Sequence, residues 1–253
     1  MRDFSTISPS ARAILLMRAQ TDIPFARAAA ELLLGPAAVA DELARVTSLR
    51  GSELRREHFA ERYRSVDRAL EASQLDRVLE LAAGLSFRGL AFAQRGKGIY
   101  LDTDLPEVIA TKQRLVRELV ETPPPNLRLL AVDAFDAGAA VAELPAGALA
   151  IINEGLLVYL DTQEKDRLAA TIRDALVARG GVWITADIYI RGPRDPRVEQ
   201  DDRLRTFLDA HRVDANKFES LAAAESLFTC AGFAIVDRAG GATRQTWVMR
   251  PSG

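Results

Sequence analysis

The chain has 253 residues, of which 48% are hydrophobic and 27% are charged, a composition typical of a globular protein with a substantial core. Its 33 lysines and arginines nearly balance 35 aspartates and glutamates, and the resulting net charge of −2 argues against a nucleic-acid partner. A single cysteine, Cys230, excludes an internal disulfide, and with only two histidines we expect no metal site.

The sequence contains no secretory signal and no run of the roughly 18 uncharged apolar residues that a membrane span needs. We therefore expect a cytoplasmic protein without a membrane partner. The oligomeric state stays open, because no motif in the sequence bears on it.

The first 75 residues are expected to be helical throughout. Serine and proline stand at a plausible helix start, before apolar residues at helical spacing, in "SPSARAILLMRAQ". A second helical stretch ends at a Gly-Pro pair, and a third, "SELRREHFAERYRSVDRALEAS", is long, charged and amphipathic. We predict that residues 1–75 form an N-terminal helical cap on a second unit, residues 76–253.

Short apolar runs alternate with helical segments after Gln74, a pattern that indicates a parallel sheet with right-handed crossovers. Strands are expected at 77–82, 98–102, 127–132, 148–153 and 181–187, and helices at 86–95, 105–121, 136–142 and 163–179. The end of the chain, "GFAIVDRAGGATRQTWVMR", predicts a hairpin at the sheet edge. The long segment before this hairpin is expected to hold extra helices, including a lid at 191–216.

Open parallel sheets bind their ligands beyond the carboxyl ends of the strands. Each expected strand ends at a carboxylate, although an aspartate at such a position is also a common helix N-cap. The residues concerned are Glu80, Asp102, Asp104, Asp133, Asp136, Glu154 and Asp187. Carboxylates at all of the strand ends together indicate a ligand site.

The turn after the first strand, "LAAGLS", keeps one glycine, Gly84, whereas Ala82 and Ser86 stand where dinucleotide-binding turns have further glycines. Those glycines let backbone N–H groups reach a pyrophosphate. An acidic site with a single glycine favours instead a cofactor that has hydroxyls to hold and a positive centre. S-adenosyl-L-methionine has both, in its ribose and its sulfonium.

Three segments together resemble the leucine carboxyl methyltransferase and polyketide O-methyltransferase family, namely "LELAAGLSFRG", "YLDTDLPEVIATKQRL" and "INEGLLVYLDTQEKDRL". The resemblance covers residues 10–190. It implies an α/β fold with a Rossmann-like seven-stranded sheet whose last strand is antiparallel, which agrees with the expected hairpin. It also implies an S-adenosyl-L-methionine-dependent O-methyltransferase that modifies a carboxylate or a hydroxyl of a small molecule.

The resemblance further implies cofactor contacts for individual residues. Gly84 matches the turn that lets the methionine part of the cofactor approach the backbone, and Ala82 stands where the family more typically has glycine. Asp104, followed by Leu105, matches the carboxylate that holds the ribose hydroxyls, with Asp102 as the alternative. Asp104 and the glutamate three residues later also form a possible capping box, so capping is a competing or additional role.

The same resemblance implies which residues contact the adenine end and the methionine end of the cofactor. Asp136 resembles the residue that accepts from the adenine amine, and Asp133 is its competitor. Glu154 matches a carboxylate near the methionine end, and a carboxylate ending an apolar strand is costly unless it is paired, which supports a binding role. Arg64 resembles an arginine that grips the methionine carboxylate, and Arg18 is a further candidate. An exposed helical position is the alternative for both arginines.

The need for a catalytic base depends on the acceptor, because a carboxylate is already ionised whereas a phenol or an alcohol must lose a proton. Tyr159 and His211 are the candidate bases. Tyr159 alternatively forms a pocket wall, since a phenol has a pKa of roughly 10, and His211 alternatively lies on a surface helix. Two other functions stay open: a methyltransferase-like protein that binds cofactor or a partner without catalysis, and a nicotinamide-dependent oxidoreductase.

Overall fold

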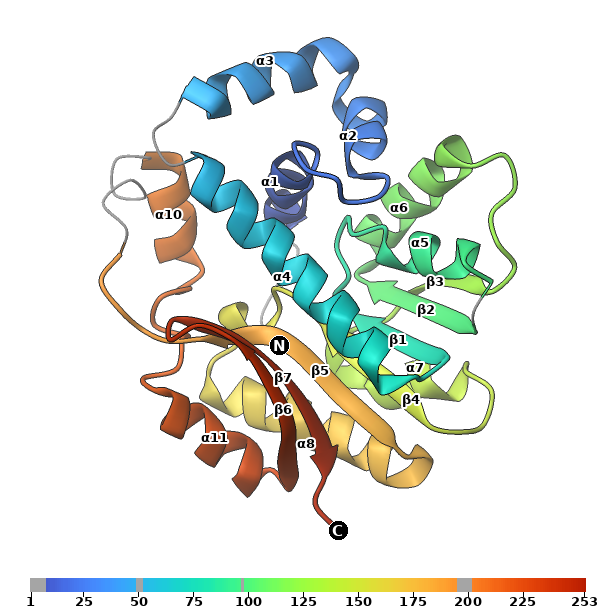
Figure 1. Cartoon of the computed structure of the whole chain (residues 1–253), viewed down its shortest axis with the longest axis vertical. Helices are drawn as coiled ribbons and strands as arrows, with labels where there is room; N and C mark the ends of the chain where they lie inside the picture. Colours follow the sequence, from blue (N-terminus) through green and yellow to red (C-terminus); the bar gives the residue numbers. More distant parts are fainter. Residues whose placement is uncertain (1–7, 49–51, 97, 195–201) are drawn as a thin grey trace.

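The computed structural model describes residues 8–48, 52–96, 98–194 and 202–253. A seven-stranded sheet with the order β3-β2-β1-β4-β5-β7-β6 forms its centre (Figure 1). The strands are β1 (Arg77–Leu81), β2 (Ile99–Asp104), β3 (Leu127–Ala131), β4 (Leu149–Asn153), β5 (Gly181–Tyr189), β6 (Phe233–Gly240) and β7 (Arg244–Pro251). Strands β1 to β5 pair in parallel, and β7 runs antiparallel between β5 and β6. The predicted Rossmann-like α/β sheet with an antiparallel last strand is confirmed.

The expected strands and the helices between them all form, with ends displaced by at most two residues. The helices are α1 (Ser8–Arg18), α2 (Ala26–Leu34), α3 (Pro36–Ser48), α4 (Ser52–Ser73), α5 (Arg88–Gln94), α6 (Pro106–Leu119), α7 (Ala137–Ala142), α8 (Thr162–Arg179), α10 (Asp202–Ala210) and α11 (Leu221–Cys230). Two 3-10 turns, η2 (Ala134–Asp136) and η3 (Leu157–Tyr159), follow the ends of β3 and β4.

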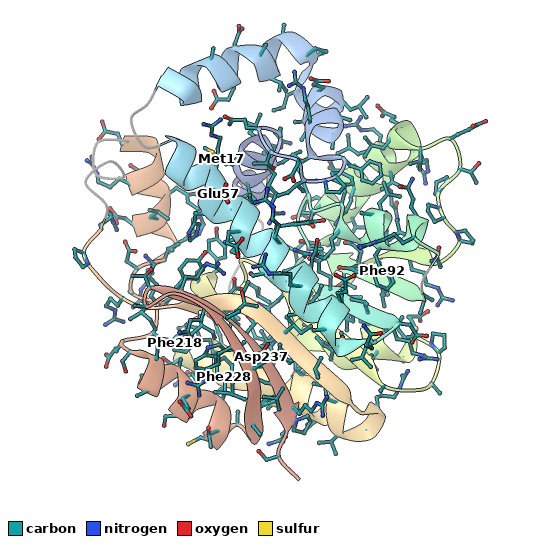
Figure 2. The ribbon with its side chains drawn as sticks, viewed as in Figure 1. Met17, Glu57, Phe92, Phe218, Phe228 and Asp237 are labelled. Atoms are coloured by element: carbon teal, nitrogen blue, oxygen red, sulfur yellow. The ribbon has the colours of Figure 1, made fainter. Side chains whose placement is uncertain are left out.

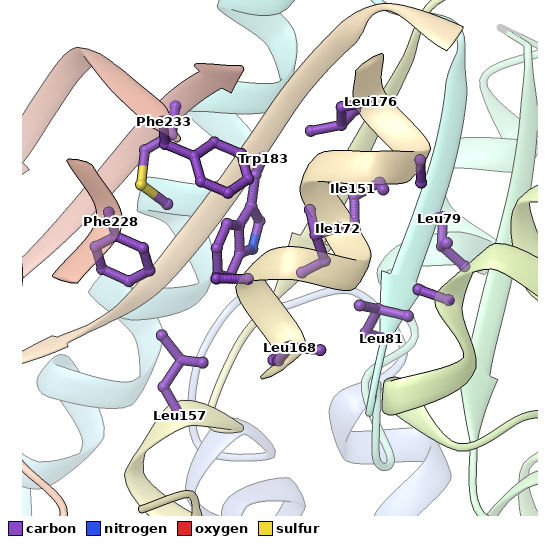
Figure 3. Close-up of a cluster of buried hydrophobic side chains, with 14 of the residues drawn as sticks. Leu79, Leu81, Ile151, Leu157, Leu168, Ile172, Leu176, Trp183, Phe228 and Phe233 are labelled. Carbon is purple, nitrogen blue, oxygen red and sulfur yellow. The ribbon is translucent and has the colours of Figure 1, made fainter. Parts of the chain in front are cut away.

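Helices cover both faces of the sheet, and α7, α8 and α11 share the core of one face. Figure 3 shows this core, in which Trp183 of β5 packs against Phe228 of α11 and Phe233 of β6, with ring centroids 5.2 and 5.3 Å apart. Full burial of a side chain of this size stabilises the fold by about 1.5–3 kcal/mol. Because both faces are covered, every residue of β4 is buried, which explains its uninterrupted apolar sequence.

The opposite face is covered in part by α4, whose Val66 and Leu70 pack with Val78, Ile152 and Ile184 of the sheet. The helices α1, α2 and α3 pack on one another and contact α4 and α6. Figure 1 shows them together at one end of the molecule. The division of the chain into residues 1–75 and 76–253 stays a prediction.

The expected lid at 191–216 is described in part, since 195–201 lie outside the described residues. Helix α10 belongs to this segment, and its Phe207 contacts Tyr159 of η3 with ring centroids 6.3 Å apart. Within the described ranges, every helix is too short or too polar to span a bilayer. The same ranges hold no group of three or more His, Cys, Asp or Glu side chains arranged for a metal ion.

Candidate cofactor and active site

A cavity that opens to solvent lies beyond the carboxyl ends of β1 to β4 and beneath α1. The predicted residues on its wall are Ala82, Gly84, Asp104, Leu105, Asp133, Glu154 and Tyr159, together with Arg18. The wall does not include Arg64, Asp136 or His211. The sheet edge therefore collects most of the predicted cofactor residues in one place, as expected for the carboxyl ends of parallel strands.

The loop after β1 enters the left-handed backbone region at Ala82 (φ +50°) and at Gly84 (φ +56°). A Cβ on Gly84 would meet only the Cβ of Ala11, at 3.5 Å, so backbone conformation rather than space favours glycine there. The N–H of Gly84 donates to Oδ2 of Asp104 at 2.6 Å. The carboxylate at the end of β2 thereby holds the β1 loop against the cavity.

Ala82 carries local strain, because an alanine with positive φ lacks the conformational freedom of glycine. We expect Ala82→Gly to raise the free energy of unfolding by up to about 1 kcal/mol, after the greater flexibility of glycine in the unfolded chain is subtracted. For a domain of this size, calorimetry should detect a rise in Tm of about 2–4 °C. The neighbouring Ala83→Gly, at a residue without positive φ, should lower Tm instead. A lower Tm for both variants would mean that Ala82 is not strained.

Asp104 has the capacity to bind a diol in the cavity. Its Oδ2 accepts from Gly84 and its Oδ1 accepts from the N–H of Leu105 at 2.7 Å, so each oxygen has one donor and room for a second. Burial raises the pKa of this carboxyl group. The capping alternative is corrected, because the N-cap of α6 is Leu105 and no side chain caps this helix end.

The structure separates the two carboxylate pairs that the sequence left undecided. Asp102 does not line the cavity; it is buried beside Lys112, whose Nζ lies 2.5 Å from Oδ2, and burial raises the pKa of Asp102 to about 7. Asp133 lines the cavity and accepts from the N–H of Phe135 at 2.9 Å, which leaves its second oxygen uncommitted. Asp136 is exposed and lies off the wall. Of these two aspartates, the one that lines the cavity is therefore Asp133, and its contact with adenine stays a prediction.

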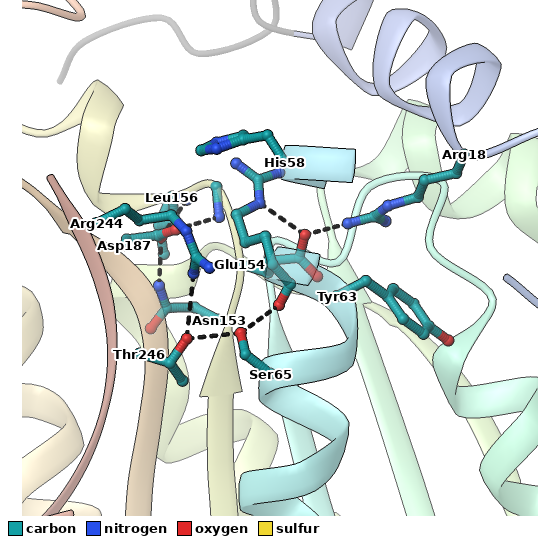
Figure 4. Close-up of polar contacts among 12 residues, drawn as sticks. Arg18, His58, Tyr63, Ser65, Asn153, Glu154, Leu156, Asp187, Arg244 and Thr246 are labelled. Carbon is teal, nitrogen blue, oxygen red and sulfur yellow. Dashed lines mark hydrogen bonds and ion pairs between the residues drawn. The ribbon is translucent and has the colours of Figure 1, made fainter. Parts of the chain in front are cut away.

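Glu154 is buried among three arginines at the other end of the cavity. Its Oε1 accepts from Nε of Arg62 at 2.8 Å and from Arg18, and its Oε2 accepts from Nη2 of Arg88 at 2.7 Å. Figure 4 shows Arg18 reaching Glu154 from α1. Burial alone would raise the pKa of Glu154, but the three guanidinium groups together hold it well below its usual range. Glu154 is therefore a permanent anion at neutral pH.

Arg88 extends this network into the core. Its guanidinium is 1% exposed and pairs with Glu80 and, at 2.7 Å, with Asp67, in addition to Glu154. It also lies over the ring of Tyr63, 4.1 Å from the centroid. Three arginines thus meet three carboxylates, so the buried network is electrically balanced. A balanced network avoids the large cost of an unpaired buried charge.

The structure places Arg64 away from the cavity, where it pairs with Asp22 at 2.5 Å on the surface of α4. The arginine of this helix that does line the cavity is Arg62. A helix turns about 200° in two residues, so both cannot face the same way. Arg62 lies three residues after Phe59 and four before Val66, on the inward face of α4, and this spacing could have identified it.

An unpaired nitrogen of Arg18 indicates whether S-adenosyl-L-methionine fits this cavity. Its side chain is 6% exposed and lines the cavity, yet its Nε has no hydrogen-bond partner among the described residues. A buried donor left unpaired costs about 1–3 kcal/mol. A carboxylate in the cavity would remove that cost, so the site fits the methionine carboxylate of S-adenosyl-L-methionine.

Tyr159 and His211 occupy different positions relative to the cavity. Tyr159 lines it, and burial raises the pKa of its phenol, which makes Tyr159 a hydrogen-bond donor rather than a base at neutral pH. The His211 ring packs edge-on against Tyr159, with centroids 6.1 Å apart, and lies off the cavity wall. Phe207 contacts both rings, so His211 belongs to an aromatic group behind Tyr159.

Asp187 holds the loop that carries Glu154. Its carboxylate accepts backbone N–H groups of Gly155, Leu156 and Leu157 at 2.6, 2.8 and 3.1 Å. The sequence indicated Asp187 only as a strand-end carboxylate, and its contacts make it a support for this loop. The sequence did not indicate that Arg88 belongs to the site, because its neighbours are those of an ordinary helix start.

The strand order, the antiparallel β7 and the cavity at the carboxyl edge define a Rossmann-like methyltransferase fold. The family model for leucine carboxyl methyltransferase matches residues 7–173. The chain belongs to this family, as the resemblance of its three motifs predicts.

Curated relatives of this chain carry the name of S-adenosyl-L-methionine-dependent methyltransferases. A relative from Mycolicibacterium smegmatis is 32% identical over 143 residues, which are 53% of this chain and 44% of that protein. Another, from Mycobacterium sp. strain JLS, is 34% identical over 126 residues, 48% of this chain and 42% of that protein. The match thus spans less than half the length of these relatives. These relatives are named for the cofactor that the motifs of this chain predict, S-adenosyl-L-methionine.

Solved structures agree in fold. The N,N-8-amino-8-demethyl-D-riboflavin dimethyltransferase of Streptomyces davawensis superposes with a TM-score of 0.55 at 18% identity, over 98% of this chain and 71% of that one. A mitomycin 7-O-methyltransferase superposes with a TM-score of 0.51 at 15% identity, over 82% of this chain and 60% of that one. At these identities the likeness shows the fold alone.

Proposed function

We propose that the protein transfers a methyl group from S-adenosyl-L-methionine to an oxygen of a small molecule, on a carboxylate or a hydroxyl. The observation that carries this proposal is the order of polar groups along the cavity. The strand order β3, β2, β1, β4 places Asp133, Asp104, Gly84 and Glu154 in that sequence. This order corresponds to adenine, ribose and methionine laid along the sheet edge.

S-adenosyl-L-methionine, once bound, would supply an electrophilic methyl group on its sulfonium to the acceptor oxygen, and the sulfur would keep the electron pair of the C–S bond. The chain's task is alignment, which can supply about 7–11 kcal/mol of the barrier. Arg18 and Arg62 would hold the methionine carboxylate, and Asp104 would hold the ribose. Glu154 fixes both arginines, so the cofactor and the acceptor meet in one geometry.

A carboxylate acceptor is favoured over a hydroxyl. The described residues on the cavity wall include no histidine, lysine or cysteine, and burial raises the pKa of Tyr159. An ionised carboxylate needs no proton removed, so this wall suits it. For a hydroxyl acceptor, the candidate bases Tyr159 and His211 stay a prediction, but the raised pKa keeps Tyr159 protonated at neutral pH and His211 lies off the cavity wall. The cytoplasmic location and the absence of nucleic-acid and membrane partners stay predictions.

The test compares Asp104→Asn with Asp136→Asn, which removes an exposed carboxylate of the same region. We expect calorimetry to show that Asp104→Asn weakens S-adenosylhomocysteine binding by about 10–100-fold, the loss of one or two charge-assisted hydrogen bonds, while Asp136→Asn changes little. Saturating S-adenosylhomocysteine should raise the wild-type Tm by about 5–10 °C.

Binding of NADH instead of S-adenosylhomocysteine would contradict the proposal and favour an oxidoreductase. Transfer of labelled methyl to a panel of carboxylates and phenols tests the reaction itself. Cofactor binding without transfer to any acceptor would favour the non-catalytic alternative.

A further inference from the structure

A second polar cluster, formed by His58, Arg62, Tyr189 and Arg244, meets the cavity at Arg62, the member of the cluster that lines it; His58 and Arg244 are labelled in Figure 4. Arg62 joins the two sites, because its Nε donates to Glu154 and its Nη1 donates to Oη of Tyr189 at 3.2 Å. Tyr189 Oη also lies 2.8 Å from Nε2 of His58. Arg244 is the cross-strand partner of Tyr189 between β5 and β7.

Among the described residues, Arg244 is a largely buried cation that pairs with no carboxylate. It is 9% exposed, and within this part of the chain its side chain makes one hydrogen bond, donated to Oγ1 of Thr246 at 3.3 Å. The other buried arginines of the described chain, Arg18, Arg62 and Arg88, all pair with Glu154. A guanidinium whose hydrogen bond goes to a neutral hydroxyl can take a bound anion as its counter-charge.

The surroundings of His58 are positively charged as well. Burial, and then the charges of Arg62 and Arg244, lower the pKa of His58 to about 4; Lys217 acts in the same direction and Glu154 opposes them. His58 is therefore neutral at pH 7 and has one N–H. The His58 tautomer with its N–H on Nδ1 lets Nε2 accept the proton of Tyr189 Oη and keeps the Nδ1 donor available to a ligand.

We propose that this cluster binds a carboxylate of the methyl acceptor, distinct from the oxygen that is methylated, with Arg244 as its counter-charge and His58 as a hydrogen-bond donor. This inference rests on the proposed methyltransferase function. The single uncompensated cation matches the one charge of a carboxylate, whereas a phosphate carries nearly two at neutral pH. The acceptor is thus a hydroxy acid or a dicarboxylic acid, held beside Arg62 next to the methionine end of the cavity.

The experiment uses the full chain saturated with S-adenosylhomocysteine and sodium benzoate as the probe. In a His211→Gln background His58 is the sole histidine, so its imidazole NMR signals are unambiguous. Benzoate is expected to raise the pKa of His58 by about 1 unit, because a bound anion favours the imidazolium. Neutral benzamide and inorganic phosphate should shift it far less.

Arg244→Gln should weaken benzoate binding by at least about tenfold, the loss of one charge-assisted contact. Arg250→Gln, an exposed arginine on the same strand, is the matched control and should bind benzoate as the wild type does. If Arg244→Gln does not fold, Arg244→Lys keeps the charge and should weaken benzoate several-fold. S-adenosylhomocysteine affinity should be unchanged in all three variants.

The outcomes separate the two proposals. Absence of S-adenosylhomocysteine binding would overturn the proposed function. Intact S-adenosylhomocysteine binding with no benzoate effect on His58, or an equal effect in Arg244→Gln, would overturn the carboxylate site alone. A phosphate effect as large as that of benzoate would overturn its selectivity for a carboxylate.

Discussion

Arg62→Gln is expected to weaken S-adenosylhomocysteine binding by about 10–100-fold and to lower the free energy of unfolding by about 2–3 kcal/mol. Arg62 is 5% exposed, lines the cavity and donates to both Glu154 and Tyr189. Its loss removes a cation from the methionine end and leaves Glu154 with two arginines instead of three. Calorimetric titration and chemical denaturation measure the two effects.

Arg64→Gln is the matched control, because it is the same substitution two residues later on the same helix. Arg64 is 36% exposed and pairs only with surface carboxylates, and such pairs contribute about 0–1 kcal/mol. We expect its cofactor affinity to equal that of the wild type. Equal losses in both variants would mean that Arg62 has no special place in the cofactor site.

Arg88→Met is expected to have the largest effect on stability, about 3–5 kcal/mol. It replaces a guanidinium that is 1% exposed with an apolar side chain of similar length, and it leaves Glu80 and Asp67 without their cation. Because Glu154 loses its Oε2 partner, S-adenosylhomocysteine should also bind more weakly. Denaturation at pH 7 and a parallel titration measure both effects.

The pH dependence of this variant provides an internal check. Burial already raises the pKa of Asp67 above its ordinary value, and removing Arg88 raises it further. When the pKa of a carboxyl group is higher in the folded state than in the unfolded state, its ionisation lowers the free energy of unfolding. This loss is complete at pH values above the folded-state pKa, and it vanishes as the pH falls to the unfolded-state pKa near 4. The gap between wild type and Arg88→Met should therefore be largest at neutral pH and smallest near pH 4. A gap independent of pH would indicate a packing defect instead.

Much of the fold was predictable because its signals are local. Apolar runs bounded by turns place the strands, and the helical segments between them impose parallel pairing. Parallel strands bring their carboxyl ends to one edge, so Gly84, Asp104 and Glu154 fall together whatever the details of packing. The motifs around these residues were sufficient for the family.

Packing rather than a sequence motif determines the places of Arg62, Arg88 and Asp133 in the site. Which arginine of α4 enters the cavity depends on which face of the helix meets the sheet, and a motif match at Arg64 does not carry that information. The choice of Asp133 over Asp136 likewise depends on how η2 turns after β3.

The sequence by itself determined the α/β sheet, the family and the acidic cavity edge, because each follows from residues close together in the chain. Only the tertiary structure decided the charge pairing. Arg18 and Glu154 are 136 residues apart, and Arg88 and Glu154 are 66 apart. The pairing of buried charges is a property of the folded packing, because each cation takes whichever carboxylate the fold brings within hydrogen-bond distance and out of water.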